Sequence, residues 1–535
     1  MNLFNYQRRP TTEVHVGHTP LGANNPIRVQ SMTNTSTMDT AASAAQTERI
    51  VAAGGEYVRL TTQGDREAQN LQLIKQALEQ DGCHVPLVAD VHFNAHVADV
   101  AALHADKVRV NPGNYVDPAR KFKHIDYTDA EYADELKKID ERFVPFLRIC
   151  QEHHTAVRIG VNHGSLSDRI MSRYGDTPEG MVESCMEFLR ICVREQFNDV
   201  VISIKASNTV IMVRTVRLLV RQMELEGMAF PLHLGVTEAG EGEDGRIKSA
   251  VGIGTLLADG YGDTIRVSLS EAPEAEIPVA IALRDYITAR AGHPHIEGTA
   301  CDTFNYFCPQ RRATLAADGI GGDNVPAVFT ATELAQLSDQ IVVLTTRHQN
   351  PVGDLRAQIH ALWSAGDQRP VVVRLDYTDT DKDSFQLHAA ADLGPLCIDQ
   401  LIDGICLTCN GLAADIVTDT AYAILQASRL RFTRPEFISC PGCGRTLYNL
   451  EETIARIKCA ILTRAEQNPR FKTLKIGIMG CIVNGPGEMA DADYGYVGAA
   501  AGRVSLYKQK ECIEKNIPEA DAVDRLLAFI EADLG

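Results

Sequence analysis

The chain has 535 residues, 45% of them hydrophobic and 23% charged, so it is long enough for two to four globular domains. Its formal net charge of −18 argues against a nucleic-acid-binding protein, because neutralising phosphates requires clustered Lys and Arg. No apolar run is long enough to span a membrane and residues 1–17 lack a secretory h-region, so we expect a cytoplasmic protein without a membrane partner.

Eight short runs of β-branched and apolar residues occupy the N-terminal half, and each is followed by a helical pattern. The runs are residues 26–34, 56–62, 86–93, 107–113, 156–164, 200–208, 231–240 and 263–272. Strands that alternate with helices pair in parallel, and eight such units in about 250 residues are typical of a (β/α)8 TIM barrel. We therefore predict an α/β fold with a TIM barrel over residues 1–292. An open, doubly wound sheet is the alternative.

The predicted strands become polar or charged near their C-terminal ends, where the active sites of barrels are assembled. Five of these ends supply a cation, and other ends supply hydroxyl, amide or imidazole groups. The cations are Arg59, Arg109, Arg158, Lys205 and Arg266. The other polar residues are Ser31, Asn34, His92, Asn111, Asn162, Ser207 and Ser268.

The five cations predict an anionic substrate. A single arginine near a strand end usually forms a salt bridge at the rim, but five cations at one end are costly to desolvate unless an anion joins them. Arginine suits phosphate oxygens, and each charge-assisted hydrogen bond is worth ~1.5–3 kcal/mol. The pattern therefore favours a phosphorylated small molecule, most simply a diphosphate.

Two carboxylates near these cations are candidate catalytic residues. Glu238 ends the seventh predicted strand, where a positive field favours its ionised form and a role as base or proton relay. The simpler role of Glu238 is to balance Arg266 or Lys205. Asp90 ends the third strand, and its simpler role is to orient a neighbour.

The pattern Gly240-x-Gly242-x-x-Gly245, which follows the seventh predicted strand, contains acidic residues, and these argue against a dinucleotide-binding site.

Residues 293–430 predict an inserted α/β domain that begins with an irregular linker. This segment is too short for a second complete barrel. Its Cys406-Leu-Thr-Cys409 motif has no second pair of ligands, so we expect two buried thiols rather than a metal site. We predict no chemistry in this domain.

The C-terminal segment contains three cysteines with the spacing of metal ligands. Cys440 and Cys443 flank a Pro-Gly turn, and Cys481 follows an apolar strand. We expect residues 484–487 to form a turn that brings Glu488 back towards Cys481. Three soft thiolates suit zinc or an iron–sulfur cluster.

Zinc and iron–sulfur differ in the fourth ligand that they require. No histidine follows His388, and Cys459 and Cys512 lack ligand spacing, so Glu488 is the remaining candidate. A carboxylate is a hard ligand that iron would hold weakly, as suits a position that a substrate oxygen takes over. The spacing therefore favours a cluster in an α+β domain over residues 431–535, and zinc remains the alternative.

The motifs CPGCGR (440–445) and GCIVNGPGE (480–488) resemble the cluster motifs of the 4-hydroxy-3-methylbut-2-enyl diphosphate synthase family. KVRVNPGN, VRIGVNHGSL, SIKASN, HLGVTEAG and DTIRVSL resemble its barrel motifs, so the resemblance covers nearly the whole chain. The middle domain resembles the long, three-domain form of plants and some bacteria. The resemblance implies reductive ring opening and dehydration of 2-C-methyl-D-erythritol 2,4-cyclodiphosphate in non-mevalonate isoprenoid biosynthesis.

The resemblance also implies a cofactor, a donor and residue roles. Three cysteines and a glutamate would hold a [4Fe–4S] cluster, and reduced flavodoxin or ferredoxin would supply two electrons singly. The implied cluster ligands are Cys440, Cys443, Cys481 and Glu488. The predicted substrate-binding residues are Arg59, Arg109, Asn111, Arg158, Asn162, Lys205, Ser207, Arg266 and Ser268. The predicted catalytic residues are Glu238, Glu488 and Asp90.

Assembly and two rival functions stay open from the sequence. Short family members place the cluster of one chain over the barrel of another in a homodimer, whereas the inserted domain could allow closure within one chain. In that case the inserted domain would serve as spacer and scaffold. The rivals are a pterin-type transferase, which needs no metal, and a non-catalytic cluster carrier, which needs no arginines.

Overall fold

The computed structural model describes residues 2–117, 126–482, 489 and 491–534, which form two compact units. The barrel unit consists of Pro10–Glu241, Gly262–Ala280 and the chain from Arg434 onward. The middle unit consists of the chain up to Arg9, Gly242–Tyr261 and Ile281–Thr433. The domain boundaries predicted at residues 292 and 430 stay predictions. No helix among the described residues is both long enough and apolar enough to cross a membrane.

The barrel unit contains all eight predicted strands, and they pair in parallel throughout. The strands are β1 (Arg28–Met32), β2 (Tyr57–Thr62), β3 (Leu87–Val91), β4 (Lys107–Val110), β5 (Ala156–Asn162), β6 (Val200–Lys205), β7 (His233–Leu234) and β8 (Thr264–Ile265). Their order is β6-β5-β4-β3-β2-β1-β8-β7, and a parallel bridge between Ile202 and Leu232 returns the last strand to the first. The TIM barrel is therefore confirmed, and the open sheet is wrong.

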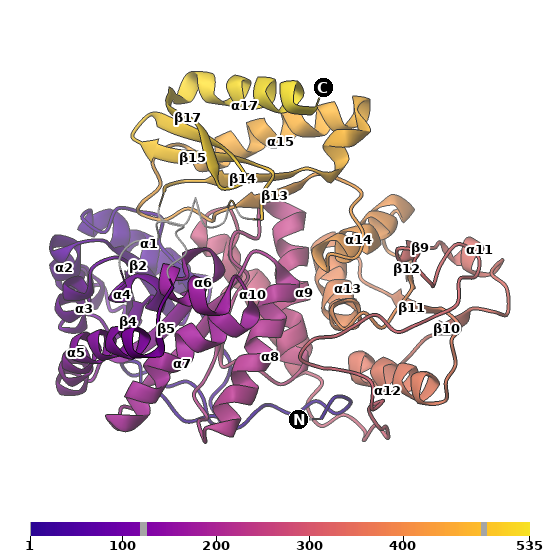
Figure 1. Cartoon of the computed structure of the whole chain (residues 1–535), viewed down its shortest axis with the longest axis horizontal. Helices are drawn as coiled ribbons and strands as arrows, with labels where there is room; N and C mark the ends of the chain where they lie inside the picture. The colour runs from indigo at the N-terminus through magenta and orange to yellow at the C-terminus, as the bar shows by residue number, and fades with distance from the viewer. Residues whose placement is uncertain (1, 118–125, 483–488, 490, 535) are drawn as a thin grey trace. The chain divides into compact units, whose positions relative to one another are not determined.

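Helices of the barrel unit surround these strands (Figure 1). They are α1 (Thr40–Ala52), α2 (Asp65–Gln80), α3 (Ala95–Ala102), α4 (Pro112–Tyr115), α5 (Asp129–His153), α6 (Asp168–Tyr174), α7 (Pro178–Arg194) and α8 (Thr209–Leu225). The long helix α5 begins at a capping box, in which Thr128 and Glu131 satisfy each other's backbone N–H groups. Its Phe143 packs against Phe188 of α7, with ring centroids 4.9 Å apart.

The middle unit contains a small parallel sheet in the order β10-β11-β12-β9. Its strands are β9 (Ala327–Val328), β10 (Val342–Leu344), β11 (Val371–Tyr377) and β12 (Gly404–Cys409). Its helices are α9 (Gly242–Ala258), the second half of α10 (Glu276–Thr288), α11 (Ala331–Leu334), α12 (Pro351–Ser364), α13 (Lys382–Ile398) and α14 (Ala414–Ala427). The predicted α/β character is confirmed, and Cys406 and Cys409 of β12 are buried free thiols.

Buried ion pairs and close helix packing hold the middle unit together. Arg356 of α12 donates to Asp259 at 2.9 Å and to Asp399 at 2.7 Å, and all three side chains are buried. Helices α9 and α13 approach closely, because a Cβ added at Gly394 would lie 2.9 Å from the Cα of Val251. The helix that follows β7 is therefore one body with the small sheet.

The C-terminal part of the barrel unit is a mixed sheet with two long helices against it (Figure 1). The strands run in the order β13 (Glu436–Ser439), β14 (Lys475–Met479), β15 (Tyr494–Ala500), β16 (Arg503–Lys508) and β17 (Glu511–Pro518). The first two pairs are parallel and the last two antiparallel. Helices α15 (Leu450–Gln467) and α17 (Glu519–Leu534) supply apolar residues to its core. This confirms the predicted α+β domain.

Candidate active site

Five cationic side chains from five strands line one cavity at the C-terminal ends of the barrel strands. Arg59, Arg109, Arg158 and Lys205 lie in β2, β4, β5 and β6, and Arg266 follows β8. All five are buried. The cavity encloses about 700 Å³ of space between protein atoms, its opening to solvent included. The structure therefore brings together all five cations that the strand ends suggested.

The register of the parallel strands places Asp90, Arg109 and Arg158 at the same level along the barrel axis. Asp90 of β3 pairs with Arg109 of β4, and Arg109 pairs with Arg158 of β5. Gly160 makes room for Arg109, whose Nη2 donates to the Gly160 carbonyl at 2.9 Å. A Cβ at Gly160 would lie 2.5 Å from Arg109 Nε, so a larger residue there would displace the arginine.

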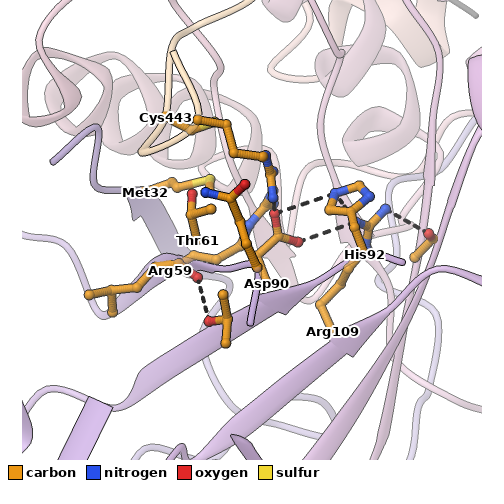
Figure 2. A network of polar contacts seen from close by, with 12 residues as sticks. Met32, Arg59, Thr61, Asp90, His92, Arg109 and Cys443 are labelled. Carbon is orange, nitrogen blue, oxygen red and sulfur yellow. Dashed lines mark hydrogen bonds and ion pairs between the residues drawn. The ribbon is translucent and has the colours of Figure 1, made fainter. Parts of the chain in front are cut away.

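Asp90 lies beneath the cavity and holds several guanidinium groups (Figure 2). Its Oδ1 accepts from Arg109 Nη1 at 3.2 Å, and its Oδ2 accepts from Arg59 Nη2 and Arg445 Nη2, each at 3.0 Å. Burial opposes ionisation of Asp90, but Arg59 above all, and also Arg109, hold its pKa well below the usual range. The carboxylate is therefore charged at neutral pH.

His92 is a neutral member of this network. Its Nε2 lies 2.8 Å from Arg109 Nη1, and since arginine only donates, Nε2 accepts and Nδ1 carries the proton. Burial, and then Arg109, lower the pKa of His92 to about 3. The ring is therefore uncharged at neutral pH and adds no further positive charge.

Arg266 is held by a different acid. Its Nε and Nη2 donate to the two oxygens of Glu276, each at 2.9 Å, and Ser31 Oγ donates to the same carboxylate at 2.7 Å. This forked pairing fixes the plane of the guanidinium. Glu276 rather than Glu238 is thus the acid that pairs with Arg266 within the described chain.

Arg158 and Lys205 form no ion pair with a carboxylate among the described residues. The Nε and Nη1 atoms of Arg158 are buried without a hydrogen-bond partner there. Burial, followed by repulsion from Arg59 and Arg109, holds the pKa of Arg158 well below its usual range. Burial, followed by Arg158 and Arg59, does the same to the pKa of Lys205. An anion in the cavity would relieve both costs.

Glu238 follows β7 and lines the same cavity. It is 2% exposed, and its backbone adopts φ +47°, a left-handed conformation that is unfavourable for residues other than glycine. Glu238 therefore shares one cavity with the cations and the cysteines.

The three cysteines with ligand spacing also line this cavity. Cys440 follows β13 and Cys481 follows β14, and these strands are parallel neighbours, so their C-terminal ends meet. The Gly480 N–H donates to Cys440 Sγ at 3.2 Å. Burial raises the pKa of Cys440 to about 12, although the Gly480 N–H opposes this shift. Cys443 lies in the same loop as Cys440, two residues before Arg445.

Three thiols from two loops are donors of the kind that an iron–sulfur cluster binds. In the described parts of the chain, no three His, Cys, Asp or Glu side chains are gathered as one ion would need. A cubane cluster binds its ligands at separate corners. Sulfur donors from two loops, with a backbone N–H on one of them, suit the cubane. Glu488 lies outside the described residues.

The cysteine loops reach the barrel mouth of their own chain. Ser439 pairs with Ala239 as a parallel bridge. The hydroxyl groups of Ser270 and Ser439 lie 2.9 Å apart, and Ser270 Oγ donates to the Cys440 carbonyl at 3.0 Å. A Cβ at Gly444 would lie 2.7 Å from the Thr35 carbonyl oxygen, so this loop packs closely on the β1–α1 segment.

The other predicted site residues fall into two groups. Asn162 and Ser268 line the cavity. Asp90, Asn111 and Ser207 do not belong to its lining. Asn111 Nδ2 donates to Ser165 Oγ at 2.8 Å, and Ser207 Oγ donates to Asp491 at 2.9 Å, so both have structural contacts.

Several lining residues were not among the predicted site residues. Arg445 had a detectable signal, because it stands two residues after Cys443 in the motif CPGCGR. His92 also had a detectable signal in the sequence, because it is a polar residue at a strand end. The apolar and small lining residues had no such signal, since residues of these types occur throughout the chain. The added lining residues are Met32, His92, Thr237, Pro441, Gly442, Arg445 and Met479.

Two family models match the chain. The GcpE TIM-barrel domain matches residues 11–281, and the GcpE protein C-terminal domain matches residues 436–532. Together they cover the barrel and both cysteine loops. The residues between them lie outside both models.

Full-length relatives are similar along the whole chain. A protein of Phocaeicola vulgatus is 56% identical over 100% of this chain and 99% of its own, and one of Bacteroides fragilis is 57% identical over 100% and 97%. A Chlorobaculum tepidum protein is 38% identical over 99% and 89%. All three are named 4-hydroxy-3-methylbut-2-en-1-yl diphosphate synthase (flavodoxin).

The solved structure of another protein is similar over about half of this chain. Stenotrophomonas maltophilia dihydropteroate synthase is 12% identical over 53% of this chain and 100% of its own, with a TM-score of 0.36. A likeness at this level says nothing about function.

Proposed function

This chain belongs to the GcpE family, and from that premise we propose that it is an oxidoreductase that converts 2-C-methyl-D-erythritol 2,4-cyclodiphosphate to 4-hydroxy-3-methylbut-2-enyl diphosphate. The reaction takes up two electrons and two protons, opens a carbon–oxygen bond of the cyclic diphosphate and releases water. One observation carries the proposal: a single cavity is lined by five barrel cations and three cysteines.

The cations would bind the diphosphate. Arg158 and Lys205 lack an ion pair with a carboxylate in the described chain, so they are the groups that gain most from a phosphate oxygen. Arg59, Arg109 and Arg266 are already oriented by Asp90 and Glu276. Asn162 and Ser268 would add neutral donors. Asn111 and Ser207 would act less directly, through the loops that they hold.

Glu238 would handle the proton that is needed to release water. The proposal is supported by the burial of Glu238 and by its presence in the cavity that the cations and the cysteines line. A carboxyl group at this position can give a proton to a leaving hydroxyl. We assign Asp90 a supporting role, because it lies under the arginines rather than along the cavity.

Cys440, Cys443 and Cys481 would hold a [4Fe–4S] cluster, with Glu488 as its fourth ligand. When bound, the cluster supplies electrons to the substrate one at a time. Flavodoxin is the donor that we propose, since the relatives carry it in their names, and ferredoxin is the other candidate. We place the reaction in the cytoplasm, and the middle domain is our candidate for a spacer and scaffold.

The direct test is a turnover assay with anaerobically purified protein. We expect about four irons per chain, and conversion of the cyclic diphosphate with reduced flavodoxin. Colourless protein that is fully active would instead favour a transferase. A cluster-containing protein that does not bind the cyclic diphosphate would favour a cluster carrier.

A matched pair of variants separates binding from electron supply. Arg109→Met should weaken binding of the cyclic diphosphate and keep the iron content, whereas Cys443→Ala should lose iron.

A third variant tests the fourth ligand. Glu488→Ala should keep some iron and lose most turnover. Unchanged turnover in Glu488→Ala would mean that Glu488 is not a ligand.

A further inference from the structure

Asp90 joins two parts of the barrel unit that are distant in sequence. The carboxylate accepts hydrogen bonds from Arg59 and Arg109 of the barrel and from Arg445 of the cysteine loop, at 3.0, 3.2 and 3.0 Å. Figure 2 shows this carboxylate among the side chains of Arg59, His92 and Arg109. Asp90 is fully buried, and Arg445 is 8% exposed.

The charges around Asp90 are not balanced. One carboxylate faces three guanidinium groups, and His92 is neutral. After burial, which is the larger cause, the positive charge of Arg445 contributes to the lowered pKa of both Arg59 and Arg109. The two barrel arginines therefore repel Arg445, and Asp90 attracts it.

The remaining ion pairs between the C-terminal domain and the barrel are weaker anchors. Lys458 lies 3.5 Å from Glu241, and both side chains are about a quarter exposed. Lys510 lies 3.7 Å from Asp176, and Lys510 is 45% exposed. Solvent screens such pairs strongly. Among the ion pairs that the structure describes here, the buried pair of Asp90 and Arg445 has the shortest distance and the least exposure.

We propose that Asp90 is a positioning residue that ties the cysteine loop 440–445 to the substrate-binding arginines, so that an anion in the cavity and the placement of this loop stabilise each other. An anion would offset the repulsion between Arg445 and the barrel arginines, as Asp90 already does in part. The inference rests on the proposed function for the identity of the natural anion. Inorganic pyrophosphate serves as the probe.

The experiment measures backbone hydrogen exchange of residues 440–447 in anaerobic, cluster-containing protein, with and without pyrophosphate. The amides of Cys440, Thr446 and Leu447 each donate to a backbone carbonyl, so loosening of the loop speeds their exchange. The variants are Asp90→Asn and Arg445→Gln. Glu241→Gln is the matched control, because it removes an ion pair between the same two domains without touching the arginines.

Each variant has a distinct expected result. In Asp90→Asn, exchange without pyrophosphate should be about tenfold faster than in the native protein, since a charged hydrogen bond is worth that much or more. Pyrophosphate should restore exchange to within about twofold of the native rate. In Arg445→Gln, exchange should be fast and insensitive to pyrophosphate. Glu241→Gln should behave like the native protein.

Two outcomes would overturn the inference. One is fast exchange in Asp90→Asn that pyrophosphate does not correct, as a general loss of structure would give. The other is an exchange rate in Arg445→Gln equal to that of the native protein. Arg445→Gln keeps the pairs of Asp90 with Arg59 and Arg109, so it can still be tested if Asp90→Asn does not fold. Turnover of the cyclic diphosphate by the native protein is measured separately, so either idea can fail while the other stands.

Discussion

At the scale of single residues, the charge of Lys205 depends on what occupies the cavity. In the protein without an anion, burial and then Arg158, Arg59, Arg266 and Arg109 hold the pKa of Lys205 well below 10.5. A bound diphosphate favours the charged form and raises this pKa. Binding at a pH between the lowered pKa and 10.5 should therefore take up protons from solution.

Calorimetry of pyrophosphate binding in buffers of different ionisation enthalpy measures this uptake. The observed heat should depend on the buffer in the native protein and should depend on it less in Lys205→Met. Lys137→Met is the control, since Lys137 lies exposed on α5. Equal heats in all buffers for the native protein would contradict the prediction.

Glu238 tests the assignment of the proton step. Glu238→Gln keeps the shape of the side chain and removes its proton transfer, so kcat should fall about 100-fold or more. Binding of the cyclic diphosphate should change little, because Glu238 is not one of the cations. A larger change in KM than in kcat would assign Glu238 to binding instead.

Four of the predicted residues that line the cavity share one property, which is that strand periodicity determines their position. Arg59, Arg109, Arg158 and Lys205 lie inside strands, so counting along each strand placed them at the cavity. Asn111 and Ser207 lie just beyond strand ends, where the chain turns away and other partners claim their side chains. Arg445 reaches the cavity from another domain, and only its place in the motif CPGCGR pointed to it.

At the scale of elements, the barrel interior contains a lysine that nothing in the proposed chemistry requires. Lys107 of β4 is fully buried, and its Nζ lies 4.3 Å from the centre of the Tyr57 ring, without a hydrogen bond to any described residue. Burial, and then Arg158, hold its pKa well below 10.5. The unfolded chain therefore binds more protons than the folded chain between that lowered pKa and about 10.5, and native stability rises with pH there.

Lys107→Met should raise the free energy of unfolding by about 1–3 kcal/mol at pH 7, because it removes an unpaired buried amine. The gain should shrink as pH rises towards 10.5. Urea unfolding at pH 7 and pH 9 measures both effects. A gain that does not vary with pH would show that ionisation of Lys107 is not its cause.

The order of strands and helices was predictable from the sequence where the hydrophobic pattern extends over many residues, and it was less predictable elsewhere. All eight barrel strands lie within the predicted runs, although β7 and β8 contain two residues each. The assignment of α9 to the same body as the small sheet was not predictable, because it depends on close packing of glycine and alanine between α9 and α13.

At the scale of the whole molecule, the buried charges of the middle unit predict how it unfolds. Arg356 forms ion pairs with two buried carboxylates, Asp259 and Asp399. Arg356→Met would remove a buried ion pair from each carboxylate, at a cost of about 3–5 kcal/mol. Calorimetry should show a lower transition temperature for the middle unit and an unchanged one for the barrel unit. Arg369→Met, at an exposed pair with Asp367, is the control.

The contact between Ser270 and the cysteine loop within one chain has a consequence for mixtures of defective proteins. A Glu238→Gln chain has intact sulfur ligands, and a Cys443→Ala chain has an intact proton donor. If each polypeptide completes its own centre, blending the two inactive preparations should recover no turnover at any ratio. Rates should likewise stay proportional to enzyme amount on dilution. Rescue in the blend would instead reveal centres assembled from two polypeptides.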